Sequence, residues 1–426
     1  MIFLQSISTL FSNDYYTFWV VAAGAGIICF ASGTVGTFSY LRKRALLGDV
    51  ISHAVLPGVV ISFMLTGVKD SLYFLTGATI SGLISIAIVD YVQSKSKLKP
   101  DTILALTLSV FFGVGIVLLT KIQHSGNGAQ SGLDSFLFGK AASMSLHDVT
   151  LFSIIAIINT ICIVLFIRPF SLISFDEEYA KGIGFNVKFI KYFLAMLTVI
   201  TVSIGIQSVG IVLMAALLIT PASGARFLTN AIPKMIFYAG FFACISGIIG
   251  VFISSTGTSM PTGPWIVVVL SSFTLLAIFF GKEKGIFARM QTRKSNQIKI
   301  NNENILKIVY KTSKEGTISV PIQDIFKESS DKSIRLTLKR LEKNNIISRV
   351  KGMIVLHENG KIAAREVIRK HRLWEIYLSK YFQLEADHLH DDAEGIEHII
   401  TPEIEKHLIT LLDRPEKDPH QSEIPY

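Results

Sequence analysis

The sequence contains few cysteines and no phosphate-binding loop. All three cysteines, Cys29, Cys162 and Cys244, lie in apolar runs, which argues against a disulfide framework and against a metal site built from thiolates. The chain has no G-x-x-x-x-G-K-[ST] segment, so it cannot bind and hydrolyse ATP in the usual way. No pairing of a nucleophile with a base stands out, and we therefore expect a protein that is not an enzyme.

Charged residues are also scarce, and their distribution divides the chain. Only 17% of the 426 residues are charged and 50% are hydrophobic, with a mean hydropathy of +0.49. These values exclude a disordered protein and most soluble enzymes. Residues 1–281 form a succession of long apolar runs, whereas residues 282–426 have the composition of a soluble domain. We expect two domains that fold in two different solvents.

Nine apolar runs in the first part are each long enough to cross a hydrocarbon core of ~30 Å. The sixth and seventh are short, and only Gln207 separates them. This pattern predicts an all-α polytopic membrane domain with about nine transmembrane helices. The runs lie at about 16–39, 46–66, 72–92, 101–121, 148–168, 190–206, 208–224, 233–254 and 264–281.

Basic residues predict how these helices are oriented. Twelve Lys and Arg residues fall in loops on one side, and Lys69, Lys121 and Lys140 fall on the other. Because basic loops tend to stay in the cytoplasm, we expect a bacterial cytoplasmic (inner) membrane protein with its amino terminus outside and its carboxyl-terminal domain inside. The twelve are Arg42, Lys43, Arg44, Lys95, Lys97, Lys99, Arg168, Lys181, Lys188, Lys191, Arg226 and Lys234.

Three polar residues interrupt the second apolar run. Asp49, Ser52 and His53 share one helical face because positions i, i+3 and i+4 are neighbours. Pro57 has no N–H, so the carbonyl of His53 lacks its usual partner. Ionisable groups within a span normally face a cavity or a partner, and a carboxylate with an imidazole suits Mn(II), Fe(II) or Zn(II). The alternative is a buried Asp–His pair that only fixes helix packing.

The stretch "FDEEYAKGIGF", residues 175–185, is predicted to lie in a cytoplasmic loop. It begins with acidic residues, is compatible with a short helix and ends in glycine. We interpret it as a docking segment for a partner protein, with an ordinary solvated loop as the alternative.

The soluble part begins with a basic segment, residues 282–299, which we expect to be a flexible linker that touches anionic membrane lipid. Helices are predicted at 303–313, 320–329 and 331–345, and a strand pair at 347–361. A basic helix followed by a hairpin is typical of a winged helix-turn-helix, although a solvated amphipathic helix remains an alternative. Its candidate DNA contacts are Lys332, Ser333, Arg335, Lys339 and Arg340, with Lys343 beside them.

Helical patterns follow at about 361–384, 387–399 and 402–413, and the first two carry possible metal ligands. His371 and Glu375 are four residues apart, and His390, Glu394 and His398 share one face, with Glu397 beside them. Five or more such groups on two helices exceed what a solvated surface usually carries. Carboxylates and imidazoles without thiolates favour Mn(II) or Fe(II) over a closed zinc site.

Residues 15–281 resemble the permeases of metal-type ABC importers, the manganese, zinc and iron class. The resemblance rests on "LLGDVISHAVLPGVV", "KPDTILALTLSVFFGVGIVLL", "DSFLFG", "FDEEYAKGIG" and "VGIVLMAALLITPASGAR". It implies that Asp49, Ser52 and His53 line the metal pathway. It also implies that the segment from Asp176 to Gly184, with Asp176, Glu177, Ala180 and Gly184, couples to a separate ABC ATPase subunit. An extracytoplasmic metal-binding protein and a second permease subunit are further implied partners.

Residues 300–426 resemble the metal-dependent repressors of the diphtheria toxin repressor and manganese transport regulator family. The match includes "RKHRLWEIYL", "HDDAEGIEHIITPEIEKHL" and "PEKDPHQSEIP". It implies one metal site with His371, Glu394, Glu397 and His398, and an ancillary site with Glu375 and His390. The manganese-type pattern has acidic ligands where this chain has Asn304 and Lys307. Asn304 still offers a carbonyl oxygen, but a protonated Lys307 cannot ligate a metal.

We therefore predict an ATP-driven divalent metal importer subunit, with Mn(II) favoured and Fe(II) or Zn(II) as alternatives, fused to a metal-dependent transcription regulator. The expected domains are a permease at 1–281, a basic linker at 282–299, a winged helix that binds a DNA operator at 300–360 and a helical metal-binding and dimerisation domain at 361–426. Two alternatives keep the permease. In one, the appended domain senses metal and gates transport without binding DNA; in the other, it is a vestigial dimerisation module.

Overall fold

The computed structural model describes residues 16–44, 46–68, 70–124, 145–257, 260–282, 284–312, 319–325, 331–382 and 396–426. The chain divides into two compact units, Met1–Ala288 and Arg289–Tyr426. Each has its own hydrophobic core.

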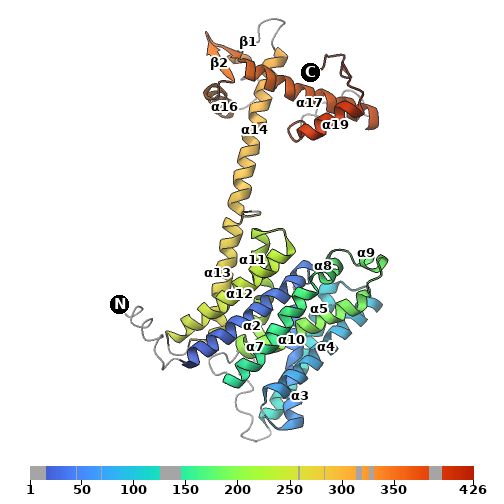
Figure 1. Ribbon diagram of the computed structural model, residues 1–426, viewed down its shortest axis with the longest axis vertical. Coiled ribbons are helices and arrows are strands. Elements are labelled where there is room, and N and C mark those ends of the chain that lie inside the picture. Colours follow the sequence, from blue (N-terminus) through green and yellow to red (C-terminus); the bar gives the residue numbers. More distant parts are fainter. Residues whose placement is uncertain are drawn as a thin grey trace. The chain divides into compact units, whose positions relative to one another are not determined.

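Nine helices in the described part of the first unit are long and apolar enough to cross a membrane, which confirms the predicted polytopic all-α domain (Figure 1). They are α2 (Tyr16–Leu41), α3 (Leu47–Thr66), α4 (Ser71–Lys95), α5 (Pro100–Gln123), α7 (Leu146–Leu165), α10 (Val187–Val209), α11 (Ile211–Leu228), α12 (Ile232–Ser255) and α13 (Thr262–Phe280). Two short helices, α8 (Ile167–Phe175) and α9 (Glu177–Gly182), connect α7 to α10.

Two local features differ from what the sequence suggests. The sixth and seventh spans separate at Gly210 and not at Gln207, which lies inside α10. Gly210 has a φ of 94°, a conformation that favours glycine because a Cβ atom would be strained there. Pro57 does not interrupt α3, which continues to Thr66.

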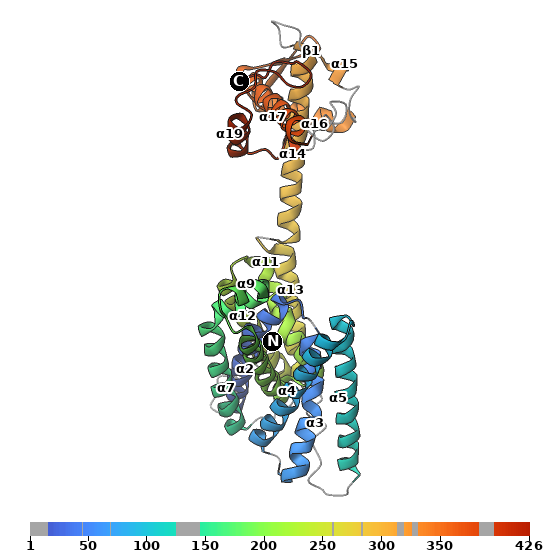
Figure 2. The same cartoon turned by 90° about the vertical axis from the view of Figure 1, so that its right-hand side faces the viewer.

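Small residues allow the membrane helices to approach closely. A Cβ atom on Gly36 of α2 would lie 1.9 Å from the carbonyl oxygen of Leu218 in α11. Where α3 crosses α4, a Cβ atom on Gly58 would lie 2.1 Å from the carbonyl oxygen of Gly77. Helix association in lipid depends on such close packing. In the bundle, α2 packs against α12, α11 and α7, and α3 against α4 and α5, as Figures 1 and 2 show.

The second unit begins with elements in the order of a winged helix. They are α14 (Ile286–Thr312), which belongs to this unit from Arg289 onward, β1 (Ser319–Pro321), α15 (Ile322–Ile325), α16 (Asp331–Lys343), β2 (Ile347–Val350) and β3 (Met353–Leu356). The strands form an antiparallel sheet in the order β1-β3-β2, with Val320 opposite Ile354 and Ile347 opposite Leu356. Of the predicted helix at 320–329, the described residues include only the short α15, which follows β1.

Two further helices complete the described part of this unit. They are α17 (Glu358–Phe382) and α19 (Pro402–Leu411). Thr401 caps α19, and its hydroxyl accepts a hydrogen bond from the N–H of Ile404. Near the end of the chain, Asp418 accepts hydrogen bonds from the N–H groups of His420 and Ser422, and its carboxylate lies 3.3 Å from Nε of Arg372 on α17. Most of the predicted helix at 387–399 lies outside the described residues.

The prediction that residues 282–299 form a flexible linker is wrong. Residues from Ile286 onward belong to α14, a single helix that continues to Thr312. The basic and polar residues 289–297 are exposed on all sides of this helix. Residues 289–297 are mostly polar and contain neither Pro nor Gly. Such a sequence can form either a helix or a coil, so its composition alone could not distinguish the two structures.

Candidate functional site

The polar face predicted in the second span lies on α3. Asp49 and His53 are half-buried, one turn apart, and close enough for their charges to interact. Ser52 is buried, and its hydroxyl donates a hydrogen bond of 2.7 Å to the carbonyl of Gly48 in the same helix. The carboxylate of Asp49 and the imidazole of His53 are therefore the partly exposed groups of this face. The hydroxyl of Ser52 already donates its proton to a hydrogen bond within the helix.

His53 of α3 lies beside α5. Its ring meets Phe112 of α5 edge to face, with 4.8 Å between the ring centroids. Phe112 is twelve residues beyond Pro100, about 18 Å along the axis of α5, which is near the middle of a ~30 Å hydrocarbon layer. Nδ1 of His53 is buried and has no hydrogen-bond partner within the described part of the chain. A buried polar atom without a partner is costly unless a ligand or a cavity uses it.

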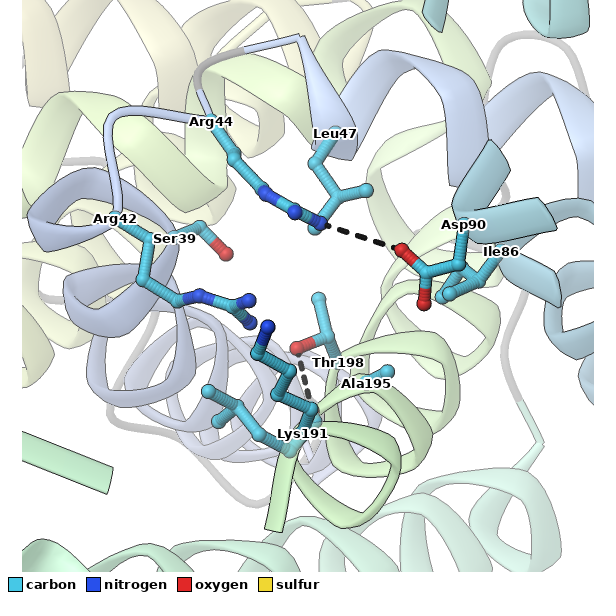
Figure 3. Close-up of a pocket in the computed structure, with 10 residues that line it drawn as sticks. Ser39, Arg42, Arg44, Leu47, Ile86, Asp90, Lys191, Ala195 and Thr198 are labelled. Carbon is cyan, nitrogen blue, oxygen red and sulfur yellow. Dashed lines mark hydrogen bonds and ion pairs between the residues drawn. The ribbon is translucent and has the colours of Figure 1, made fainter. Parts of the chain in front are cut away.

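A narrow cavity lies at the start of α3, where it is lined by Leu47, two residues before Asp49 in the sequence. Figure 3 shows Arg42, Arg44 and Lys191 directing their cationic groups into this space beside Leu47. On the opposite wall, Asp90 of α4 lies 3.8 Å from Arg44. Three cations and one carboxylate give this cavity a positive balance, which opposes the passage of a divalent cation.

Glu177, the first residue of α9, is tied to the same cations. Its carboxylate lies 2.5 Å from Nζ of Lys191 and 4.0 Å from the guanidinium of Arg42. The pKa of Arg42 is lowered to about 10, first by burial and then by the nearby charge of Arg44, while Glu177 acts in the opposite direction. The predicted coupling segment therefore contacts the residues that line the cavity through Glu177.

The other residues in and beside the predicted coupling segment differ in how far they are buried. Asp176 caps α9 by accepting a hydrogen bond of 2.9 Å from the N–H of Tyr179, and Ala180 is fully buried among apolar side chains. Gly184 has a φ of 90° with open space around it. Large apolar side chains are exposed, namely Phe175, Tyr179, Ile183, Phe185 and Phe189.

The candidate DNA contacts lie on α16. Its buried face comprises Ile334, Thr337, Leu338 and Leu341. On other faces, Arg335 and Lys339 are exposed and Arg340 is half-buried. Lys332 and Ser333 belong to the first turn of α16, but their side chains are outside the described structure. A helix with one apolar face and exposed basic residues is what phosphate contact requires.

In the second unit, three of the predicted metal ligands meet in a buried cluster. Nε2 of His371 lies 3.0 Å from Glu375, and Nδ1 of His371 lies 2.5 Å from Oε2 of Glu397. All three side chains are at most 3% exposed. Both ring nitrogens of the histidine thus face carboxylate oxygens.

The fourth member of this cluster is Lys307, which extends from α14. Its Nζ lies 3.1 Å from each carboxylate oxygen of Glu397 and 3.5 Å from Nδ1 of His371. Burial alone lowers the pKa of His371, but hydrogen bonds to Glu375 and Glu397 raise it above its ordinary value. Burial raises the pKa of Glu397, yet His371 and Lys307 together bring it below its usual range.

Of the remaining predicted ligands, the structure describes His398 and Asn304. Nδ1 of His398 lies 2.6 Å from Glu303 and its Nε2 lies 3.7 Å from Glu397. Oδ1 of Asn304 is buried and accepts no hydrogen bond from the residues that the structure describes. His390 and Glu394 lie outside the described residues.

The described residues of this cluster do not fit a divalent metal at Glu397 and His371. These two side chains contact each other, and the Lys307 ammonium lies against both. Within the described ranges no group of three or more His, Cys, Asp or Glu side chains is arranged to hold a metal ion.

Two features were missed by reasoning from the sequence. Glu303 was not singled out, although its spacing of four from Lys299 and Lys307 marks one face of α14. In the sequence, Arg42, Arg44 and Lys191 indicate only how the helices are oriented. The contacts of Arg42 and Lys191 with Glu177 arise because the fold brings together positions that are far apart in the sequence.

Residues 13–281 match the ABC 3 transport family, and residues 357–426 match the iron dependent repressor, metal binding and dimerisation domain. The manganese transport system membrane protein MntC of Bacillus subtilis (strain 168) is 38% identical over 372 residues, which cover 86% of this chain and 85% of that protein.

One other relative and one solved structure are similar to this chain over about two thirds of its length. The zinc transport system membrane protein TroC of Treponema pallidum (strain Nichols) is 35% identical over 291 residues, 68% of this chain and 97% of that protein. Among solved structures, PsaBC from Streptococcus pneumoniae in complex with Fab is similar with 31% identity and a TM-score of 0.60, covering 68% of this chain and 99% of that chain. The protein is thus a member of the ABC 3 transport family that also carries the metal-binding and dimerisation domain of the iron-dependent repressors.

Proposed function

We propose that this protein is the permease subunit of an ATP-driven importer of divalent metal ions, with Mn(II) as the favoured substrate and Fe(II) or Zn(II) as alternatives. The observation that carries this proposal is the pair of Asp49 and His53 within α3, where Nδ1 of His53 has no partner among the described residues. Relatives named as manganese and zinc transport proteins support a divalent substrate. Carboxylate and imidazole ligands suit all three ions, so these two residues alone do not select one.

The metal is the substrate, and Asp49 and His53 are its proposed ligands along the path. An ion that enters the bundle must replace part of its water shell, and a carboxylate with an imidazole nitrogen can do so. Ser52 is a weaker candidate because its hydroxyl proton is donated to Gly48, although its oxygen can still accept or ligate. The cations around the cavity beside Leu47 would oppose exit on that side and hold the ion near Asp49.

We further propose that α9 couples transport to a separate ABC ATPase subunit. The exposed apolar face with Tyr179 and Ile183 offers a docking surface, while Ala180 anchors the helix to the bundle. Movement of α9 would pull on Glu177 and disturb its contacts with Lys191 and Arg42. Through these contacts the movement would shift the cations that face the cavity and open the path.

The proposed orientation places the amino terminus outside and residues 282–426 in the cytoplasm of a bacterium, as the basic loops indicate. The importer would also contain an extracytoplasmic metal-binding protein and a second permease subunit, either a copy of this chain or a related one. The exposed basic residues of α14 would lie against anionic lipid.

We propose that residues 300–360 bind a DNA operator through α16. Arg335 and Lys339 are exposed on this helix, opposite its apolar face, and the order of elements is that of a winged helix. Residues 361–426 would provide dimerisation, consistent with the family match of residues 357–426.

Uptake of radiolabelled manganese tests the transport proposal. The chain and its ATPase are expressed in a host that lacks its own manganese importer. A hydrogen bond to a charged group contributes ~1.5–3 kcal/mol. A contact of at least that strength is lost with either ligand of the metal ion, so Asp49→Ala and His53→Ala should each reduce uptake by at least about tenfold.

Ser52→Ala tests the weaker candidate, and it should retain most of the uptake because its hydroxyl is bonded within α3. Immunoblots establish that all variants insert equally. Normal manganese and zinc uptake by both ligand variants would show that these residues are not the metal path.

A further inference from the structure

The buried cluster of the second unit already contains a cation. Lys307 is 4% exposed, and its ammonium group lies at equal distances of 3.1 Å from both oxygens of Glu397. Both oxygens of one carboxylate thus face a single positive centre, as they would in a bidentate metal site. This cation is part of the polypeptide and cannot dissociate.

Among the described residues, the cluster already holds a positive charge beside its carboxylates. The Lys307 ammonium lies against both oxygens of Glu397, and the His371 imidazole lies between Glu375 and Glu397. Each nitrogen of His371 faces a carboxylate oxygen, whereas a metal-bound histidine needs a free lone pair. A divalent ion entering beside Lys307 would meet a like charge in a region of low dielectric, where such repulsion is strong.

A stripe along α14 holds the segment that carries Glu397. Lys299, Glu303 and Lys307 are spaced by four residues and therefore share one face. Nζ of Lys299 donates a hydrogen bond of 3.0 Å to the carbonyl of His398, and Glu303 lies 2.6 Å from the imidazole of the same residue. Three side chains of one helix thus fix two adjacent residues from the far end of the unit.

We propose that the Lys307 ammonium takes the place of a metal ion in the buried cluster of His371, Glu375 and Glu397, so that this part of the regulatory domain is assembled without a divalent ion. The assembled state of α14 against α17 and residues 397–398 is then permanent. Metal levels do not control the domain through this cluster. The inference concerns the second unit alone and does not rest on transport by the first.

The test uses the full-length chain in detergent, with Asp49→Ala and His53→Ala to remove the membrane ligands. The chain has three tryptophans, Trp19, Trp265 and Trp374. Replacement of the first two by Phe leaves Trp374, next to Glu375, as the reporter. Thermal unfolding is followed by its fluorescence in EDTA and in Mn(II).

We expect the midpoint of this background protein to be the same in EDTA and in Mn(II). Lys307→Glu, which supplies an acidic side chain, should gain a Mn(II)-dependent rise in the midpoint and Mn(II) quenching of Trp374. Lys294→Glu makes the same charge change at an exposed position of α14 and should gain neither.

A Mn(II)-dependent rise in the midpoint of the background protein would overturn the proposal, whatever the variants do. If Lys307→Glu does not fold, Lys307→Gln replaces it as the second measurement. A lower midpoint for Lys307→Gln, with no Mn(II) effect on the background protein, supports a structural cation. An unchanged midpoint for Lys307→Gln would contradict it.

Discussion

Ionisable side chains occur in the interior of both units, and their partners differ. The ammonium group of Lys307 is paired with both oxygens of Glu397, and such pairing is what makes a buried charge tolerable. Nδ1 of His53, in contrast, has no partner in the described part of the chain. A group that is paired within the protein stabilises it, whereas an unpaired group in a span indicates a site for something that arrives from outside.

The buried charge of Lys307 leads to a stability prediction. Lys307→Met would remove the ammonium group that contacts both oxygens of Glu397, and loss of one partner from a buried ion pair typically costs about 3–5 kcal/mol. We expect a loss of that order in the free energy of unfolding, measured by denaturant titration with Trp374 as the probe. Lys294→Met at an exposed position serves as the control, and equal stabilities of the two variants would refute the prediction.

At this scale, local spacing predicted some groupings and missed others. The shared face of Asp49 and His53 follows from the period of the helix, because both residues belong to one element. The contact of Lys307 with Glu397 joins residues that are 90 positions apart, and no local pattern contains it. The sequence did indicate that Lys307 is out of place among metal ligands, but only the structure shows what it contacts.

Among the elements, the crossing of α3 and α4 shows how backbone proximity depends on glycine. Gly58 and Gly77 face each other there, and Ser81 of α4 donates a hydrogen bond of 2.6 Å to the carbonyl of Ala54 in α3. This crossing holds α3, and therefore Asp49 and His53, in position against α4.

A single methyl group should disturb this crossing. A Cβ atom on Gly58 would overlap the carbonyl of Gly77, and overpacking typically costs about 1–3 kcal/mol. We expect Gly58→Ala to lower the thermal midpoint of the protein in detergent. Gly113→Ala is the control, since no atom lies within 4 Å of its Cβ position and Ala stabilises a helix interior by roughly 0.5–1 kcal/mol. A midpoint for Gly58→Ala as high as that of Gly113→Ala would show that the helices can separate freely.

Neighbouring acidic residues of α9 should behave differently. Glu177 contacts Lys191 and Arg42, whereas Glu178 is exposed. We expect Glu177→Gln to reduce metal transport while the ATPase still binds and hydrolyses ATP, because the link to the cavity is lost. Glu178→Gln should affect transport much less. Transport per ATP hydrolysed measures the difference, and equal ratios in the two variants would argue against coupling through Glu177.

The sequence predicted those helices and strands that have a distinct hydrophobic pattern. Nine apolar helices follow from run length, and β2 with β3 follows from the predicted hairpin. The extent of α14 was not predicted, because a polar stretch carries no hydrophobic period. The helix break at Gly210 was placed three residues early, because the apolar runs on both sides are continuous and the conformation of one glycine decides the boundary.

On the scale of the whole molecule, a member of a transport family carries a repressor domain in the same chain. Each unit has its own hydrophobic core. The first has a candidate site for a metal substrate, and the second has a cluster filled by Lys307. The two units therefore differ in how they are expected to respond to metal.

DNA binding by the full chain gives a prediction at this scale. In nanodiscs of neutral lipid, affinity for a mixed-sequence duplex should fall with salt, and the slope should decrease by about 0.9 for each phosphate contact removed. We expect Arg335→Ala combined with Lys339→Ala to reduce the slope. Lys406→Ala, at an exposed position of α19, should leave it unchanged. Equal slopes for all three proteins would exclude α16 as the DNA contact.

The central claim is that the metal substrate is bound within the membrane bundle by Asp49 and His53. Electron spin echo spectroscopy of Mn(II) bound to the purified full-length chain tests it directly, because a histidine ligand produces a nitrogen coupling. We predict that the coupling is present in the native sequence, lost in His53→Ala and retained in His371→Gln, since His371 lies beside the Lys307 ammonium. A nitrogen coupling that persists in His53→Ala and disappears in His371→Gln would contradict the claim and place the bound ion in the regulatory domain.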